Sequence, residues 1–116
     1  MSKYKIQETD EAINDVSNLA IWIYEQYCNE AAAENLIDQY SNKVDALELF
    51  PHGFRGVSIE HRGYEIHFFP FSNYNIFFIV RDDHEDVVIL RVLHQLQDWN
   101  RILRFDNVYH FGGRIF

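Results

Sequence analysis

The chain has 116 residues, of which 47% are hydrophobic and 16% aromatic, and its formal net charge is −8. This length suits one domain that buries its core without metals or crosslinks, and two prolines and five glycines give no sign of a disordered linker. The single cysteine excludes an intrachain disulfide. The lack of a signal sequence or a long apolar run predicts a cytoplasmic protein without a membrane span.

The acidic charge is concentrated in the first half of the chain. Residues 1–50 contain three lysines and ten acids, whereas residues 51–116 contain seven arginines and eight acids. Binding to nucleic acid through many phosphate contacts ordinarily needs a basic surface, because released counterions supply most of the affinity. The charge therefore argues against direct nucleic-acid binding, and leaves open a local arginine-rich face in the second half.

The first fifty residues predict a short strand followed by two helices. A candidate strand covers residues 4–7, and Thr9 has the side chain of a helix cap. Apolar residues then recur at helical spacing over residues 10–28 and again over residues 30–49. Because Asn29 is almost the whole connection, we expect the two helices to form an antiparallel pair.

Three apolar runs dominate the segment that follows, at residues 64–71, 74–80 and 87–93. Each has the length of one strand and is rich in aromatic and β-branched residues, which suit a pleated surface. The breaks of two and about six residues allow only antiparallel hairpins, since a parallel return needs a dozen or more residues. The sequence therefore predicts an α+β fold, in which an N-terminal strand and an antiparallel helix hairpin pack on one face of a mainly antiparallel sheet.

The remaining segments are less regular. Residues 54–62 fit either a brief strand or an ordered loop, and a last helical turn is predicted from Asp98 to Leu103. Residues 104–116 form an aromatic tail within a single domain covering residues 1–116. Apolar residues on the sheet face away from the helices exceed a one-sided core, so we expect either a partner or this tail to cover that face.

Motifs on two neighbouring strands resemble the RelE/ParE superfamily of bacterial toxins. Tyr74 to Phe78 read YNIFF, similar to the family's YRIFY, and Ile89 to Trp99 read ILRVLHQLQDW, similar to its ILRVLHGRRDW. With weaker matches in the helix hairpin, the resemblance covers roughly residues 4–103. It implies a small cytoplasmic toxin that a cognate antitoxin neutralises. One branch of the family cuts messenger RNA on the ribosome, and another inhibits DNA gyrase without being a nuclease.

The basic residues that the resemblance assigns to the RNA-cleaving site are replaced here. They fall on Glu65, His67, Asn75 and Leu96. Such chemistry needs cations beside the scissile phosphate, and each missing one costs on the order of 100-fold in rate. The sequence therefore favours a ParE-like toxin that is not an enzyme and binds a protein target such as DNA gyrase. The alternatives are a ribosome-dependent mRNA endonuclease with unusual residues, or a detoxified member that only binds its antitoxin.

Several polar residues are candidates for chemistry. His94 and Asp98, four residues apart, suit an acid/base pair; more simply, His94 caps the strand end and Asp98 caps the following turn. Glu65 and His67 share one strand face and form a second candidate couple, although polar pairs are common on half-exposed strands. Trp99 is expected to pack against the helix hairpin rather than to contact a ligand.

The candidate target-binding residues are four arginines and one tryptophan: Arg81, Arg91, Arg101, Arg104 and Trp99. The first two arginines lie near strand ends and are also expected to pair with neighbouring carboxylates. The last two flank the apolar pair of the predicted final turn and suit a cationic contact with the target. The six histidines and Cys28 lack the compact spacing of metal ligands, and no glycine-rich phosphate loop occurs, so no metal or cofactor is predicted.

Overall fold

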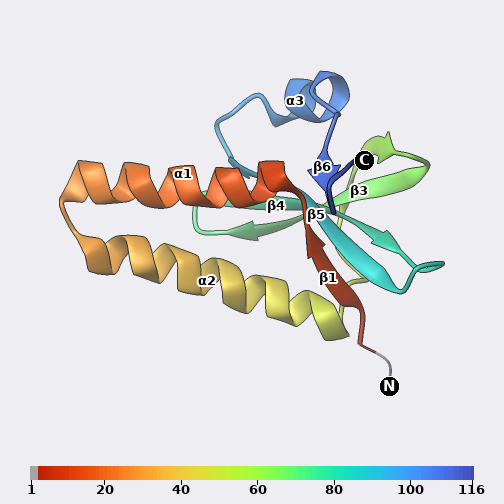
Figure 1. The fold of residues 1–116 in the computed structure, drawn as a ribbon, viewed down its shortest axis with the longest axis horizontal. Coiled ribbons are helices and arrows are strands. Elements are labelled where there is room, and N and C mark those ends of the chain that lie inside the picture. The colour runs from red at the N-terminus through yellow and green to blue at the C-terminus, as the bar shows by residue number, and fades with distance from the viewer. Residues whose placement is uncertain (1–2) are drawn as a thin grey trace.

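The computed structural model describes residues 3–116, which fold into three helices and seven strands. In chain order these are β1 (Lys5–Glu8), α1 (Asp10–Tyr27), α2 (Glu30–Leu49), β2 (Gly56–His61), β3 (Tyr64–Phe71), β4 (Tyr74–Arg81), β5 (Asp86–His94), α3 (Trp99–Phe105), β6 (His110–Phe111) and β7 (Arg114–Ile115). The predicted α+β architecture is confirmed, and Figure 1 shows the helix hairpin beside the sheet.

A five-stranded sheet in the order β1-β5-β4-β3-β2 forms the centre of the molecule. Strands β2 to β5 make an antiparallel meander in which each strand pairs with the next. At the other edge β1 lies parallel to β5, with Ile6 opposite Val87. The hairpin and the meander supply the long connection that a parallel pair requires.

Helices α1 and α2 run antiparallel, and their linked end extends past the strands (Figure 1). The hydroxyl oxygen of Thr9 accepts a hydrogen bond from the amide of Ala12 at 3.0 Å and donates one to the carbonyl of Leu90 at 2.8 Å. This buried cap therefore fixes the start of α1 to β5. Cys28 takes a left-handed conformation with φ of 46°, which ends α1 one residue before the predicted end, and Asn29 caps α2.

Each face of the sheet carries its own hydrophobic core, because successive strand residues point to opposite faces. The core under the hairpin is built from both helices and from alternate strand positions, including Leu36, Tyr40, Leu47, Ile76, Phe78, Val87 and Ile89. The second core, on the opposite face, includes Ile66, Phe77, Ile79, Val88, Leu90, Leu93, Leu103 and Tyr109. The sheet is therefore packed on both faces.

The second core is closed by the chain's own C-terminal segment. Leu103 of α3 is 1% exposed, Tyr109 is 0% exposed, and Phe116 packs against the same cluster. Of the two expected covers for this face, partner or tail, the structure shows the tail. Strands β6 and β7 pair with each other and stand apart from the main sheet.

Two segments differ in detail from the sequence prediction. Residues 56–61 form the edge strand β2, whose register with β3 shifts around Ser58, a residue with φ of 61°. Such a bulge breaks the alternation on which strand prediction depends. Helix α3 follows its cap Asp98 and ends at Phe105, two residues beyond the predicted Leu103.

Candidate functional site

His94 lies at the end of β5, in a turn that its own contacts hold. Its amide donates to the side-chain oxygen of Gln97 at 2.7 Å, and its Nδ1 accepts from the amide of Leu96 at 3.0 Å. Asp98 instead accepts from the amide of Arg101 at 3.3 Å and caps α3. Within residues 3–116 no hydrogen bond joins His94 to Asp98, so both side chains serve as local caps.

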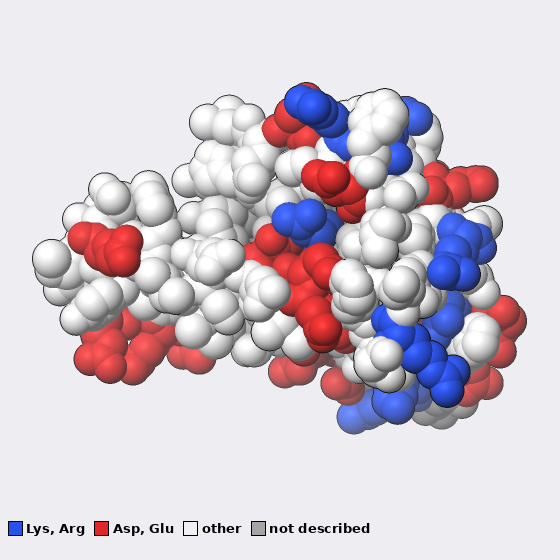
Figure 2. Space-filling model, turned by 45° about the horizontal axis from the view of Figure 1, so that its top comes forward, with Lys and Arg blue, Asp and Glu red and all other residues white. Residues whose placement is uncertain are grey.

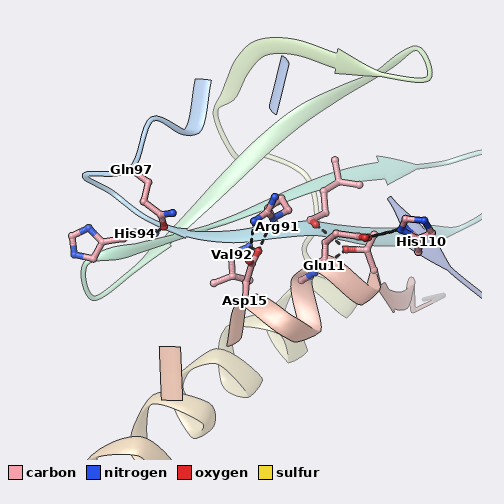
Figure 3. Close-up of polar contacts among 10 residues, drawn as sticks. Glu11, Asp15, Arg91, Val92, His94, Gln97 and His110 are labelled. Carbon is pink, nitrogen blue, oxygen red and sulfur yellow. Dashed lines mark hydrogen bonds and ion pairs between the residues drawn. The ribbon is translucent and has the colours of Figure 1, made fainter. Parts of the chain in front are cut away.

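The guanidinium of Arg91 is bound by a carboxylate from the helix hairpin. Its Nε and a terminal nitrogen donate to the two oxygens of Asp15 at 2.7 and 2.9 Å, and Asp15 also accepts from the amide of Val92 at 2.9 Å (Figure 3). The hydrogen bonds that Arg91 donates to Asp15 raise the pKa of Arg91 above its ordinary value. Arg91 is thus committed to joining β5 to α1.

Arg81 is held in a similar way at the opposite end of the sheet. Its Nε donates to Asp86 at 2.7 Å, and both side chains are largely buried. Its guanidinium carbon also lies 5.3 Å from the centre of the Phe116 ring. The pairing with Asp86 raises the pKa of Arg81 and neutralises its charge locally.

The two arginines of α3 are exposed. Arg101 and Arg104 both face solvent, and the Nε of Arg104 donates to the side-chain oxygen of Asn100 at 2.7 Å. Arg104 also borders a hollow between α3 and β2 that Glu65 lines from the other side. An acidic side chain therefore shares the hollow with this arginine.

The first two altered family positions lie against β2. Glu65 lies over Gly56, where an added Cβ atom would meet its carboxylate oxygen at 1.8 Å, so a larger residue at position 56 would displace the Glu65 side chain. The Nδ1 of His67 donates to the carbonyl of Phe54 at 2.9 Å. Within the described chain no hydrogen bond couples Glu65 to His67.

The other two altered positions lie at the far end of the meander. Asn75 pairs with Pro70 across β3 and β4, five residues along the strand from Glu65. At about 3.3 Å per residue this separation is on the order of 16 Å. Leu96, in the turn after β5, is 85% exposed. The four positions therefore form no compact cluster.

The expected position of Trp99 is wrong. Its ring lies 5.6 Å from that of Phe77 in the second core, on the sheet face opposite the helix hairpin. The cause is the direction of the chain after β5, which takes α3 across that face. Half-buried there, Trp99 closes the margin of a core.

Two contacts that tie down the C-terminal tail gave no signal in the sequence. His110 donates its amide to Glu11 at 2.7 Å, and its Nδ1 lies 2.7 Å from the other oxygen of that carboxylate (Figure 3). The Nε2 of His61 donates to the main-chain oxygen of Phe116 at 2.7 Å. These partners are 99 and 55 residues apart, beyond the reach of local patterns.

An apolar groove runs between the hairpin and the strand ends, and we name it the hairpin groove. Two adjoining hollows make it up, and both are lined by Trp22, Tyr74 and His94. The first continues to Tyr27 at the tip of α1, and the second continues to Leu96 after β5. Sequence reasoning missed the groove, although the run LAIWIY at residues 19–24 signals an unusually apolar helix.

The charges around the hairpin are one-sided. Residues 16–42 contain four carboxylates and no Lys or Arg. On the face drawn in Figure 2, the projecting hairpin shows acidic and uncharged side chains, and the basic ones gather over the other end of the molecule. The hairpin groove therefore lies in a region of negative potential.

The fold is that of RelE/ParE-like toxins. The structure resembles a chain in the crystal structure of the toxin-antitoxin complex RelBE2 from Mycobacterium tuberculosis, with a TM-score of 0.54 and 22% identity over 84% of this chain and 97% of the other. A family model described as the ParE toxin of the type II toxin-antitoxin system parDE matches residues 6–99. The chain therefore belongs to the ParE toxin family, which confirms the resemblance found in the sequence. No curated protein sequence matches it.

Residues 3–116 provide neither a membrane-spanning helix nor a cluster of metal ligands. No helix in this range combines the length and apolarity needed to cross a membrane. Nor do three or more His, Cys, Asp or Glu side chains gather there in a way that would hold a metal ion.

Proposed function

We propose that the protein inhibits growth by binding a protein target such as DNA gyrase, and that a cognate antitoxin neutralises it in the cytoplasm. The observation that carries this proposal is the state of the four positions that the resemblance assigns to catalytic cations. They hold Glu65, His67, Asn75 and Leu96, with one acid and no Lys or Arg among them.

The arginines available elsewhere do not make up for this loss. Arg81 and Arg91 are each paired with a carboxylate of this chain, which neutralises their charge within the fold. Cleavage of RNA requires preorganised cations where negative charge develops on the phosphate. Binding to a protein surface has no such requirement, so the residues present favour binding over catalysis.

Two observations support an antitoxin partner. The chain belongs to a family of toxins from type II toxin-antitoxin systems, and the similar solved structure is that of a toxin-antitoxin complex. The hairpin groove also leaves large apolar side chains in contact with water, including Trp22 at 50% and Tyr27 at 67% exposure. Exposed apolar patches of this kind commonly mark partner surfaces.

Controlled expression in bacteria, combined with a supercoiling assay on purified DNA gyrase, tests the proposal. We expect growth arrest with a DNA-damage response, intact transcripts, and loss of supercoiling as the purified protein is added. Co-expression of the protein encoded by the neighbouring reading frame should restore growth. Truncated messages on ribosomes would instead establish the endonuclease, and normal growth would establish a detoxified member.

A further inference from the structure

A bulge in β2 opens the edge of the sheet beside α3. The first pair between β2 and β3 is Gly56 with His67. The next is Glu60 with Glu65, so four steps along β2 match two steps along β3. Between them Ser58 takes a left-handed conformation with φ of 61°, which is strained for a residue with a Cβ atom. Bulges of this kind bend an edge strand and change the direction of its side chains.

The bulged strand and α3 enclose a hollow of about 820 Å³, which we name the α3–β2 hollow. This volume lies within the range of small-molecule sites, roughly 300–1,000 Å³. Its lining combines two buried apolar side chains, Ile59 at 6% and Leu103 at 1% exposure, with exposed polar and charged ones. An apolar floor with a few polar groups around it is the usual composition of a ligand site.

Opposite charges line the α3–β2 hollow. Glu60 and Glu65 come from the two strands, and Arg104 comes from α3. Within residues 3–116 no ion pair joins the arginine to either carboxylate, and its Nε donates to Asn100 instead. The two glutamates also lie directly opposite each other across the strands, a like-charge pairing that destabilises a sheet. A ligand that brings a cation to the glutamates and an anion to the arginine would compensate all three charges.

The residues around the hollow indicate the chemistry of each end of that ligand. A guanidinium has five donors in one plane and can therefore serve two neighbouring carboxylates. Its aliphatic stem suits the floor of Ile59 and Leu103, and Phe105, 76% exposed at the rim, offers a ring for stacking. At the other end Arg104 retains its terminal nitrogens for a carboxylate. An arginine residue with a free carboxyl group has both ends.

We propose that the α3–β2 hollow binds an arginine residue that carries a free carboxylate, with the guanidinium at Glu60 and Glu65 and the carboxylate at Arg104. Two kinds of molecule have this chemistry, namely free arginine and a peptide with arginine at its carboxyl end. The site shares no lining residue with the hairpin groove, and it does not depend on the cellular target of the protein.

Calorimetric titration of the full chain with matched ligands tests the site. N-acetyl-arginine carries both charges, N-acetyl-citrulline replaces the guanidinium with a neutral urea of similar shape, and N-acetyl-argininamide lacks the carboxylate. We expect N-acetyl-arginine to bind about tenfold more tightly than either analogue, because each analogue loses charge-assisted hydrogen bonds. Free arginine and the tripeptide glycyl-glycyl-arginine then distinguish the two sources, since the tighter binder of the two is the natural form of the ligand.

Three variants locate the two ends of the ligand, and thermal melting checks that each variant folds. Glu65→Gln should weaken N-acetyl-arginine about fivefold or more and leave N-acetyl-citrulline unchanged. Arg104→Gln should remove the preference for N-acetyl-arginine over its amide. The matched control is Glu34→Gln, which neutralises an exposed carboxylate of α2 outside the hollow and should change neither affinity.

Equal affinity for N-acetyl-arginine and N-acetyl-citrulline, equal losses in Glu65→Gln and Glu34→Gln, or the failure of every ligand to bind at millimolar concentration would overturn the proposal. None of these outcomes depends on toxicity. If the hollow binds N-acetyl-arginine but the protein does not arrest growth, the proposed function fails and the site stands.

Discussion

At the scale of single residues, two arginines of the sheet, Arg81 and Arg91, form ion pairs that stabilise the fold. Arg91 and Asp15 form a two-point contact between β5 and α1, and both side chains are less than one-fifth exposed. Asp15 also satisfies the amide of Val92. One carboxylate thereby accepts from three donors, and its loss leaves a largely buried guanidinium without its counter-ion.

Asp15→Asn should therefore reduce the free energy of unfolding by about 2 kcal/mol or more, since breaking a buried pair leaves its partner uncompensated. Urea titration measures the change. The matched control is Glu48→Gln, which breaks an exposed contact of 3.8 Å with Lys3 and should cost less than about 0.5 kcal/mol. Similar losses in the two variants would show that the Arg91 pair has no special structural role.

A second prediction concerns the histidine that holds the tail. Burial lowers the pKa of His61 below its usual 6.5, and the hydrogen bond to the Phe116 main-chain oxygen only partly offsets this effect, with Arg62 adding to the lowering. Because the folded pKa is depressed, the unfolded chain takes up the proton first as the pH falls. Stability from this group is complete above pH 6.5 and is lost as the pH falls from 6.5 through the folded pKa.

Replacing the histidine isolates that pH dependence. His61→Gln should be less stable than the native chain at pH 7.5, and its stability should fall less steeply below pH 6.5. Thermal melts at half-unit steps of pH compare the two slopes. Parallel slopes would assign the pH dependence to other groups.

At the scale of elements, the sequence predicts those parts whose pattern is local. The helix cap Thr9, the short link at Asn29 and all three apolar strands are where the pattern places them. Prediction fails where distant contacts decide the structure. The four residues of β1 carry no signal for parallel pairing with β5, the bulge at Ser58 hides β2, and the course of the chain after β5 determines the position of Trp99.

The candidate site follows the same rule. Glu65 and His67, which stand where the resemblance places catalytic cations, can be read directly from the sequence because these positions align locally. By contrast, the hairpin groove needs α1, β4 and the turn after β5 to come together, with Trp22 and Leu96 more than seventy residues apart. No local pattern reports such a surface.

The C-terminal cover leads to a prediction about one element. Leu103 of α3 is 1% exposed in the second core, so Leu103→Ala should reduce the free energy of unfolding by about 2 to 4 kcal/mol. Phe105→Ala, on the same helix but exposed, should change it by less than about 0.5 kcal/mol. Equilibrium denaturation of both variants checks this. An equally mild effect of Leu103→Ala would mean that α3 does not seal this face in solution.

At the scale of the whole molecule, the architecture separates two tasks. The sheet is covered on both faces by the chain itself, which leaves the acidic hairpin with its apolar groove as a surface suited to a partner. On the face drawn in Figure 2 the hairpin shows no basic side chains, whereas basic and acidic side chains lie together over the other end of the molecule. This surface suits binding to another macromolecule. The positions where the resemblance places cleavage chemistry contain no Lys or Arg.

Incubation with end-labelled messenger RNA in a reconstituted translation system tests this central claim most directly. We expect the message to remain full-length at protein concentrations that inhibit purified DNA gyrase. Accumulation of shorter RNA ends, in the presence of ribosomes and in proportion to the protein added, would contradict it.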